Sequence, residues 1–339
     1  MSCDFRGEPP ADSHDTHSRQ PTAEPARAGG ESGSSTLASP EKHETVPPQL
    51  GDDCLILAGP TAAGKSAIAI PLAQRLDAEI VSVDSMAVYR RLDIGTAKPS
   101  VAEQRLVPHH AIDLVAANEP FSVAAWLTAV GRAVESIRSR GRKVLFVGGT
   151  PLYLKALREG LTERPAADPA VRETLARRVE REGSAALHRE LTQLDPEAAA
   201  RIHPNDARRI VRAIEVATLS PPSAASPAAP TWNTAQGPSP AAPLLVLDVP
   251  RRLLAERIAT RVQRMFAEGL VEEVQVAEAS VGLGPTARQA AGYSEVLAML
   301  AGEITRDQAI EQTIRRTRQL AKRQRTWFRS FQDAVWICG

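Results

Sequence analysis

The sequence is poor in cysteine, and its few cysteines are not arranged for a disulfide or a metal site. The 339 residues include three, Cys3, Cys54 and Cys338, which lie far apart in the chain. A secreted disulfide scaffold or a zinc module would show paired or closely spaced cysteines. We therefore expect a protein of a reducing compartment, with Cys54 as a small core residue.

The chain also lacks a long apolar run and a marked excess of either charge. No stretch approaches the length of a membrane-spanning helix, and the N-terminus has no continuous apolar signal core. These absences predict a cytoplasmic protein that does not associate with membranes. Because 41 Lys and Arg balance 40 Asp and Glu, any surface for nucleic acid must be local.

Residues 1–49 have scarcely any large apolar side chains and are rich in Ser, Pro, Gly, Glu and His. Such a segment cannot bury enough surface to offset its ordering entropy, so we expect a disordered N-terminal extension. The rest of the chain is long enough for one large or two modest domains.

One stretch fits a phosphate-binding loop at every fixed position. Gly59-Pro60-Thr61-Ala62-Ala63-Gly64-Lys65-Ser66 follows an apolar strand-like run and precedes a helix-like one, with the spacing G-x-x-x-x-G-K-[ST]. Glycines let backbone N–H groups curl around phosphate oxygens, the lysine adds a charge, and the serine hydroxyl can ligate Mg²⁺. The motif predicts a bound phosphate chain without saying which one.

Two further predicted strands end in polar residues. One ends at Asp84, and the other, Lys143 to Val147, ends in Gly148-Gly149-Thr150 rather than in an acid. Residues just past the carboxyl ends of parallel strands face the ligand crevice, so Asp84 should point towards the phosphate loop; the alternative is that it caps the next turn. A typical phosphate-loop NTPase has an acid at such a strand end to hold Mg²⁺, so the sequence leans away from ATP hydrolysis.

The second half of the chain is rich in helices with basic faces. A Pro/Ala/Ser-rich segment, 220–243, interrupts it before a buried strand at Leu244 to Val249. Towards the end, Arg318, Lys322, Arg325 and Arg329 recur at helical spacing, with Trp327 and Phe328 among them. A basic stripe with aromatics suits nucleic-acid binding, although the aromatics could instead seal the helix onto the core.

Three functions compete at this point. A small-molecule kinase binding ATP and Mg²⁺ leaves the long basic helices unexplained. A non-catalytic RNA-binding module driven by nucleotide should have an acid-ended strand and a switch segment, and neither is evident. A transferase acting on RNA, with the loop holding a pyrophosphate leaving group, accounts for most features.

Six segments together resemble the tRNA dimethylallyltransferase family, in order and from about Cys54 to Trp336. They are residues 59–66, 82–85, 93–99, 147–150, 203–206 and 322–329. The resemblance implies transfer of a dimethylallyl group from its diphosphate to the exocyclic N6 amine of the adenosine just 3′ of the anticodon. Kinase activity and transfer to free adenine nucleotides stay open as alternatives.

The family fold implied is α/β, a phosphate-loop NTPase-like core of parallel strands with a helical insertion and basic C-terminal helices. Residues 50–160 would form the first part of the core. Residues 161–243 would form the insertion that grips tRNA, with 220–243 as its loop. Residues 244–339 would complete the core and carry the basic helices.

The resemblance also implies a role for each matched residue. Asp84 would be the general base for the adenine amine, and Thr150 and Arg261 would stabilise the departing pyrophosphate. Gly59, Pro60, Thr61, Ala62, Ala63, Gly64, Lys65 and Ser66 would bind the diphosphate, with Ser66 helping to place Mg²⁺.

The partners implied are dimethylallyl diphosphate and the anticodon stem-loop of tRNA, bound by a monomer. The residues expected to contact tRNA are Ser85, Met86, Ala87, Val88, Arg172, Arg208, Arg209, Arg212, Gln289, Gly292, Tyr293, Lys322, Arg323, Gln324, Arg325, Trp327 and Arg329.

Overall fold

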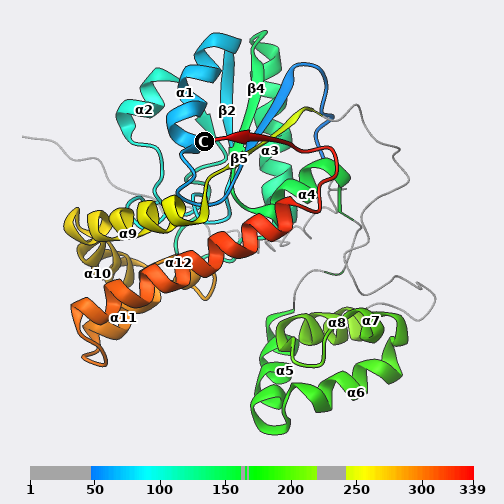
Figure 1. The fold of residues 1–339 in the computed structure, drawn as a ribbon. Helices are drawn as coiled ribbons and strands as arrows, with labels where there is room; N and C mark the ends of the chain where they lie inside the picture. The colour runs from blue at the N-terminus through cyan, green and yellow to red at the C-terminus, as the bar shows by residue number, and fades with distance from the viewer. Residues whose placement is uncertain (1–46, 162–164, 166–167, 220–241) are drawn as a thin grey trace, which may run out of the picture. The chain divides into compact units, whose positions relative to one another are not determined.

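A computed structural model describes residues 47–161, 165, 168–219 and 242–339 of the chain. Its centre is a six-stranded, all-parallel sheet in the order β3-β2-β4-β1-β5-β6 (Figure 1). The strands are β1 (Cys54–Ala58), β2 (Ala78–Val83), β3 (His109–His110), β4 (Lys143–Gly148), β5 (Leu244–Asp248) and β6 (Val335–Cys338). The expected α/β fold with a parallel sheet is confirmed.

The sheet is buried because its central strands are nearly continuous apolar runs with helices on both faces. Ile56, Leu57 and Leu145 are at most 1% exposed, as parallel strands covered on both sides require. The chain crosses from β1 to β2 through α1 (Lys65–Leu76) and returns to β4 through α3 (Val123–Ser139). Right-handed crossovers in opposite directions place these two helices on opposite faces.

The strand order brings three strand ends together. Ala58 at the end of β1 pairs with Gly148 of β4, and Gly148 pairs in turn with Val83 of β2. A Cβ at Gly148 would lie 2.1 Å from the Val83 carbonyl oxygen, so only glycine allows this approach. The segments that follow these strands, which carry the phosphate loop, Asp84 and Thr150, therefore begin side by side.

Smaller helices complete this half of the core. Ser100 caps α2 (Val101–Leu106) through a reciprocal capping box with Glu103, and the Ser122 side chain caps α3. α4 (Pro151–Glu159) starts directly after Thr150, with proline in its first turn.

In the insertion, the described residues 168–219 form four helices with a hydrophobic core of their own. They are α5 (Pro169–Glu182), α6 (Ser184–Leu194), α7 (Pro196–Arg201) and α8 (Ala207–Leu219). Leu187 and Leu191 of α6 and Ile210 of α8 are fully buried in this second core. The Asp168 carboxylate accepts the N–H groups of Ala170 and Val171, so it caps α5 as the Asp-Pro pair predicts.

The chain returns to the sheet through β5 and ends in long helices. These are α9 (Arg251–Ala267), α10 (Leu270–Ser280), α11 (Tyr293–Leu300) and α12 (Arg306–Phe328), with a 3₁₀ turn at Ala287–Gln289. α9 and α12 pack against each other below the sheet in Figure 1. β6 then pairs with β5 as the parallel edge strand of the sheet.

Two parts of the expected domain organisation lie outside the described residues. The N-terminal extension falls there except for residues 47–49, as does the Pro/Ala-rich segment except for residues 242–243. Within the described ranges, no helix is both long and apolar enough to cross a membrane.

Candidate active site

The phosphate loop joins β1 to α1 in the shape that its sequence predicts. Gly64 has a φ of 98°, a left-handed conformation that favours glycine, and Lys65 is the first residue of α1. The Lys65 ammonium donates to the carbonyl oxygens of Gly59 and Pro60, both at 2.9 Å. The loop thus folds around its own lysine and holds the positive charge at the helix N-terminus.

The charge on Lys65 is held in a confined environment. Removal of the ammonium from water lowers the pKa of Lys65 to about 8, and repulsion from Arg261 adds to this effect. The Asp84 carboxylate opposes it by favouring the charged form. These interactions place Lys65, Asp84 and Arg261 within one electrostatic site.

Asp84 directly follows β2, and its two carboxylate oxygens have different environments. Its Oδ1 accepts the backbone N–H groups of Met86, at 2.8 Å, and Ala87, at 3.3 Å, so the capping interpretation of this residue is correct. Among the described residues no hydrogen-bond donor is assigned to Oδ2. One oxygen therefore fixes the carboxylate in place, and the other is left to accept a proton.

Thr150 joins the end of β4 to the end of β2. Its N–H donates to the Val83 carbonyl at 3.2 Å, and its Oγ1 accepts the N–H of Ser85 at 3.1 Å. The same residue is the N-cap of α4. Thr150 and Asp84 are thus held in a fixed relation at the ends of two neighbouring strands.

Two arginines of α9 approach the phosphate loop from the other side. Arg261 lies with Nη1 3.4 Å from Thr61 Oγ1, and Arg257 donates to the Ala63 carbonyl at 3.2 Å. Desolvation lowers the pKa of Arg261, against the attraction of Asp84. Sequence reasoning did not single out Arg257 as a site residue, although its spacing of four from Arg261 puts both on one helix face.

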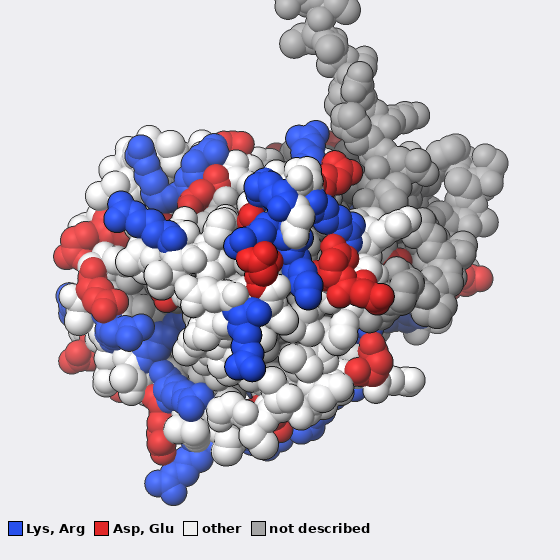
Figure 2. All heavy atoms as spheres, turned by 90° about the horizontal axis from the view of Figure 1, so that it is seen from above, with Lys and Arg blue, Asp and Glu red and all other residues white. Residues whose placement is uncertain are grey.

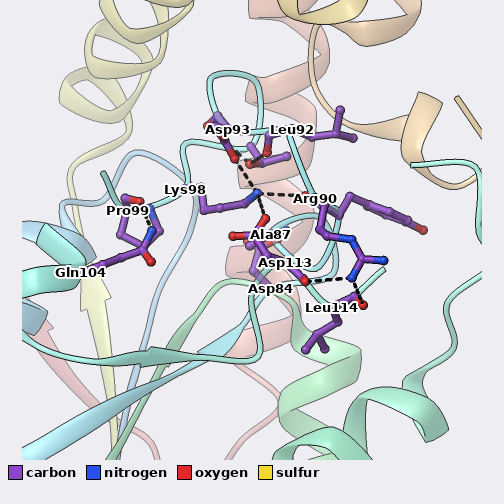
Figure 3. A network of polar contacts seen from close by, with 12 residues as sticks. Asp84, Ala87, Arg90, Leu92, Asp93, Lys98, Pro99, Gln104, Asp113 and Leu114 are labelled. Atoms are coloured by element: carbon purple, nitrogen blue, oxygen red, sulfur yellow. Dashed lines mark hydrogen bonds and ion pairs between the residues drawn. The ribbon is translucent and has the colours of Figure 1, made fainter. Parts of the chain in front are cut away.

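A loop after β2 keeps the segment behind Asp84 in place (Figure 3). The buried Lys98 ammonium pairs with Asp93 and Asp113, both at 2.6 Å, and donates to the Tyr89 carbonyl at 2.9 Å. The Asp113 N–H in turn donates to the Ala87 carbonyl. Lys98 thus supports the turn that Asp84 caps.

Tyr293 supports the same loop from α11. Its hydroxyl donates to Glu273 at 2.6 Å, and Glu273 also accepts the N–H groups of Asp93, Ile94 and Gly95. A Cβ at Gly95 would lie 2.2 Å from the Tyr293 ring. Tyr293 is fully buried, so it braces the loop and does not present its side chain to RNA in this structure.

The other residues expected to contact tRNA divide by exposure. Ser85 and Met86 are half-buried beside Asp84, whereas Ala87, Val88, Gly292 and Gln324 are buried. The exposed side chains, for which a tRNA contact stays a prediction, are Arg172, Arg208, Arg209, Gln289, Lys322, Arg323, Trp327 and Arg329.

Gln324 occupies a place that differs from its expected one. Its amide points into the phosphate site, where Oε1 accepts the Thr61 N–H at 2.9 Å and Nε2 donates to the Gly149 carbonyl at 2.6 Å. A buried amide bridging two loops binds protein and not RNA. Its sequence position, one turn after Ala321 on the buried side of α12, was the available signal.

The basic stripe of α12 borders a groove between α9 and α12. The groove has a volume of about 300 Å³ and an apolar floor that includes Leu254 and Ile258. Its charged lining is Arg251, Arg318, Lys322, Arg325 and Arg329. Arg325 is partly neutralised by Asp248, at 2.8 Å, whereas Lys322 and Arg329 are exposed.

The two aromatic residues of the stripe have different environments. Phe328 is fully buried and does seal the helix onto the core. Trp327 is 42% exposed, which leaves part of its ring available for stacking.

In the insertion, a buried carboxylate fixes two of the expected arginines. Glu215 is fully buried and accepts from Arg172 Nε at 3.0 Å and from Arg212 Nη1 at 2.5 Å. It also accepts the Asp168 N–H at 2.7 Å. Arg208 and Arg209 lie exposed on the first turn of α8.

Elsewhere on the core, basic side chains are paired with acids. Arg138, Arg140 and Arg142, just before β4, form ion pairs with Asp53, Glu79 and Asp77. Figure 2 shows one face on which Lys and Arg are interspersed with Asp and Glu. Such a surface offers no continuous positive field, in contrast to the exposed end of α12.

The described residues contain no group of three or more His, Cys, Asp or Glu side chains that could by itself hold a metal ion. A magnesium ion usually keeps several waters and takes one or two protein oxygens together with phosphate oxygens. The exposed Ser66 hydroxyl at the start of α1, and the Asp84 carboxylate that interacts electrostatically with the neighbouring Lys65, are oxygen ligands that fit that kind of site.

Comparison with known proteins gives the same assignment along most of the chain. Residues 87–331 match the family described as IPP transferase, and residues 53–109 match the one described as isopentenyl transferase. A tRNA dimethylallyltransferase of Geobacter metallireducens is 46% identical over 287 residues, covering 84% of this chain and 91% of that protein. One from Trichlorobacter lovleyi is 45% identical over 285 residues, covering 84% and 92%.

Solved structures agree. The tRNA isopentenylpyrophosphate transferase of Bacillus halodurans matches with a TM-score of 0.60 at 37% identity, over 85% of this chain and 90% of that one. A eukaryotic dimethylallyltransferase acting on tRNA matches with a TM-score of 0.66 at 28% identity, over 84% and 73%. With its phosphate loop, Asp84 and Thr150 at adjoining strand ends, this chain belongs to the tRNA dimethylallyltransferase family.

Proposed function

We propose that this protein transfers a dimethylallyl group from dimethylallyl diphosphate to the N6 amine of the adenosine 3′-adjacent to the tRNA anticodon. The observation that carries the proposal is the meeting of a diphosphate-type loop with a carboxylate, Asp84, that has one oxygen free to accept a proton. Membership of the family supports tRNA as the acceptor and speaks against a small-molecule kinase.

The donor's diphosphate would lie against residues 59–66, at the N-terminus of α1. Lys65, Arg261 and Thr150 would face the oxygens on which negative charge grows as the carbon–oxygen bond breaks. A Mg²⁺ ion held by Ser66, with Asp84 near it, would neutralise further charge on the leaving diphosphate.

The acceptor amine would meet the allylic carbon between the loop and Asp84. The N6 lone pair forms the new carbon–nitrogen bond, the electrons of the carbon–oxygen bond leave with the diphosphate, and Oδ2 of Asp84 takes the amine proton. The adenine must leave its stack to reach this crevice, at a cost of a few kcal/mol that contacts elsewhere must offset.

Those contacts would come from the anticodon stem-loop binding exposed basic side chains. The exposed side chains that would contact phosphates are Lys322, Arg323 and Arg329 of α12 and Arg208 and Arg209 of α8, and the part-exposed Trp327 would stack on a base. We propose that the protein acts as a monomer in the cytoplasm, where a reducing environment suits its free Cys54 and Cys338.

The function is tested by incubating the protein with unmodified tRNA and either labelled dimethylallyl diphosphate or γ-labelled ATP. We expect label in tRNA from the prenyl donor only, at the adenosine after the anticodon. Phosphate transfer from ATP would identify a kinase instead. Label on free AMP at a comparable rate would identify the adenine-nucleotide alternative.

Asp84→Asn separates the two roles of that residue. An asparagine oxygen still accepts the N–H groups of Met86 and Ala87, but it cannot take a proton. We expect kcat for prenyl transfer to fall by about 10²–10⁴, with tRNA binding retained. Asp52→Asn, at an exposed acid before β1, is the control. A near-normal kcat for Asp84→Asn would remove Asp84 from the role of base.

A further inference from the structure

Gln324 connects three segments that are far apart in the sequence. It lies on α12, 263 residues from Thr61 and 175 residues from Gly149, and is 7% exposed. Its side-chain oxygen and nitrogen each make a hydrogen bond, one to the phosphate loop and one to the turn after β4. Both hydrogen bonds go to backbone groups, so the bridge depends on Gln324 alone.

The bridge also sets the space around Lys65. The Cα of Gly149 faces the loop so closely that a Cβ there would lie 2.9 Å from Gln324 Nε2, 3.2 Å from Gly59 O and 3.5 Å from Lys65 Nζ. The Gly59 carbonyl in turn accepts from Lys65. The amide of Gln324, the turn at Gly149 and the loop lysine therefore pack against one another at the phosphate loop.

We infer that Gln324 is a positioning residue that fixes the phosphate loop against the Gly149–Thr150 turn and so preorganises the diphosphate site. This inference rests on the proposed function of the loop as the donor site. Without the bridge, the Thr61 N–H loses its acceptor, and the loop must be ordered at the moment of binding. The side chains of the neighbouring Lys322 and Arg323 are exposed, whereas that of Gln324 is buried. One turn of α12 therefore has one side chain bound to the phosphate loop and two that face solvent.

The test compares diphosphate binding with tRNA binding in the full-length protein. Gln324→Met keeps a similar volume and removes both hydrogen bonds. We expect the Kd for inorganic pyrophosphate, measured by calorimetry without tRNA, to rise about tenfold. The Kd for unmodified tRNA without donor should stay within about twofold. In steady state, the KM for dimethylallyl diphosphate should rise and that for tRNA should not.

Gln319→Met is the matched control, since it changes an exposed glutamine of the same helix. Gly149→Ala should also weaken pyrophosphate binding, because its methyl group would displace the Gln324 amide. This variant breaks the bridge without changing a residue of α12. Its effect on pyrophosphate binding should not add fully to that of Gln324→Met, since both break one bridge.

Each outcome decides something definite. If the wild type binds pyrophosphate and both variants bind it equally well, the inference is wrong. Equal losses of pyrophosphate and tRNA affinity would mean that Gln324 only stabilises α12, which also overturns it. If the wild type does not bind pyrophosphate at all, the proposed donor site itself fails.

Discussion

At the scale of single residues, the charge of Lys65 should make donor binding depend on pH. Its pKa of about 8 lies below the usual value for lysine, so in the free site the ammonium loses its proton as the pH rises above 8. A bound diphosphate favours the protonated form, so binding above pH 8 requires the uptake of a proton. The dissociation constant should then rise by up to about tenfold per pH unit above 8.

This prediction is checked by comparing the wild-type protein with its Lys65→Arg variant, because a guanidinium stays protonated over the whole pH range measured. Binding of dimethylallyl diphosphate should be measured from pH 6.5 to 9.5 for both proteins. Ionisation of the ligand affects both curves alike, so the ratio of the two dissociation constants isolates Lys65. A ratio that does not change across pH 8 would show that the ammonium stays charged in the free site.

Sequence reasoning placed the chemistry of individual residues better than their contacts. The phosphate-loop spacing identified Lys65 and Ser66, and the strand ends identified Asp84 and Thr150. It placed Gln324 and Tyr293 among the residues that contact tRNA, whereas both side chains are buried. The position of Gln324 on the buried side of α12 was a signal for this, but the loops that the two side chains meet, at Thr61 and at Gly95, could not be predicted from the sequence because they lie far away in the chain. Motif membership alone says nothing about side-chain direction.

At the scale of elements, the exposed part of α12 should carry the salt-dependent share of tRNA binding. Lys322 and Arg329 are exposed, whereas the guanidinium of Arg325 pairs with Asp248 and donates to the Val249 carbonyl. We expect Lys322→Ala with Arg329→Ala to weaken tRNA binding and to reduce the slope of log K against log salt by about 1–2. Filter binding between 50 and 300 mM salt measures this slope.

Arg75→Ala is the control for that experiment, since it removes an exposed charge at the far end of α1. Arg325→Ala should reduce the salt slope less than Lys322→Ala does, because its charge is already paired. Full retention of affinity in the double variant would show that this face of α12 does not meet the RNA.

Helices with both an end signal and an apolar period were predictable, whereas α7, which has an end signal but no apolar period, was missed. Ser122, Asp168 and Gly269 are residue types that favour a helix start, and they are the N-caps of α3, α5 and α10. α7 was not predicted as a separate helix, although Asp195-Pro196 repeats the Asp-Pro signal that opens α5. At six residues α7 is too short for an apolar period to show, so only its cap could have revealed it.

At the scale of the whole molecule, the strand order determines the site, and the sequence predicts a parallel sheet without its strand order. Periodicity cannot tell that β4 inserts between β1 and β2, yet this order alone aligns Ala58, Gly148 and Val83 at one edge. Hydrophobic pattern also cannot divide the buried residues between two cores, because leucines of α6 and of β4 look alike in sequence.

Those two cores permit a test of how the functions are distributed. Leu187 is fully buried in the core formed by α5–α8, and Leu154 of α4 is 1% exposed in the core around the sheet. A Leu→Ala change at either place costs about 2–5 kcal/mol through lost burial and the cavity left behind.

We expect Leu187→Ala to weaken tRNA binding several-fold while the Kd for pyrophosphate stays unchanged, because the insertion has its own hydrophobic core and contributes no residue to the phosphate loop. Leu154→Ala should instead weaken pyrophosphate binding, since α4 begins at Thr150. Calorimetric unfolding identifies which core each change destabilises, and a loss of pyrophosphate affinity in Leu187→Ala would show that the two parts do not act independently.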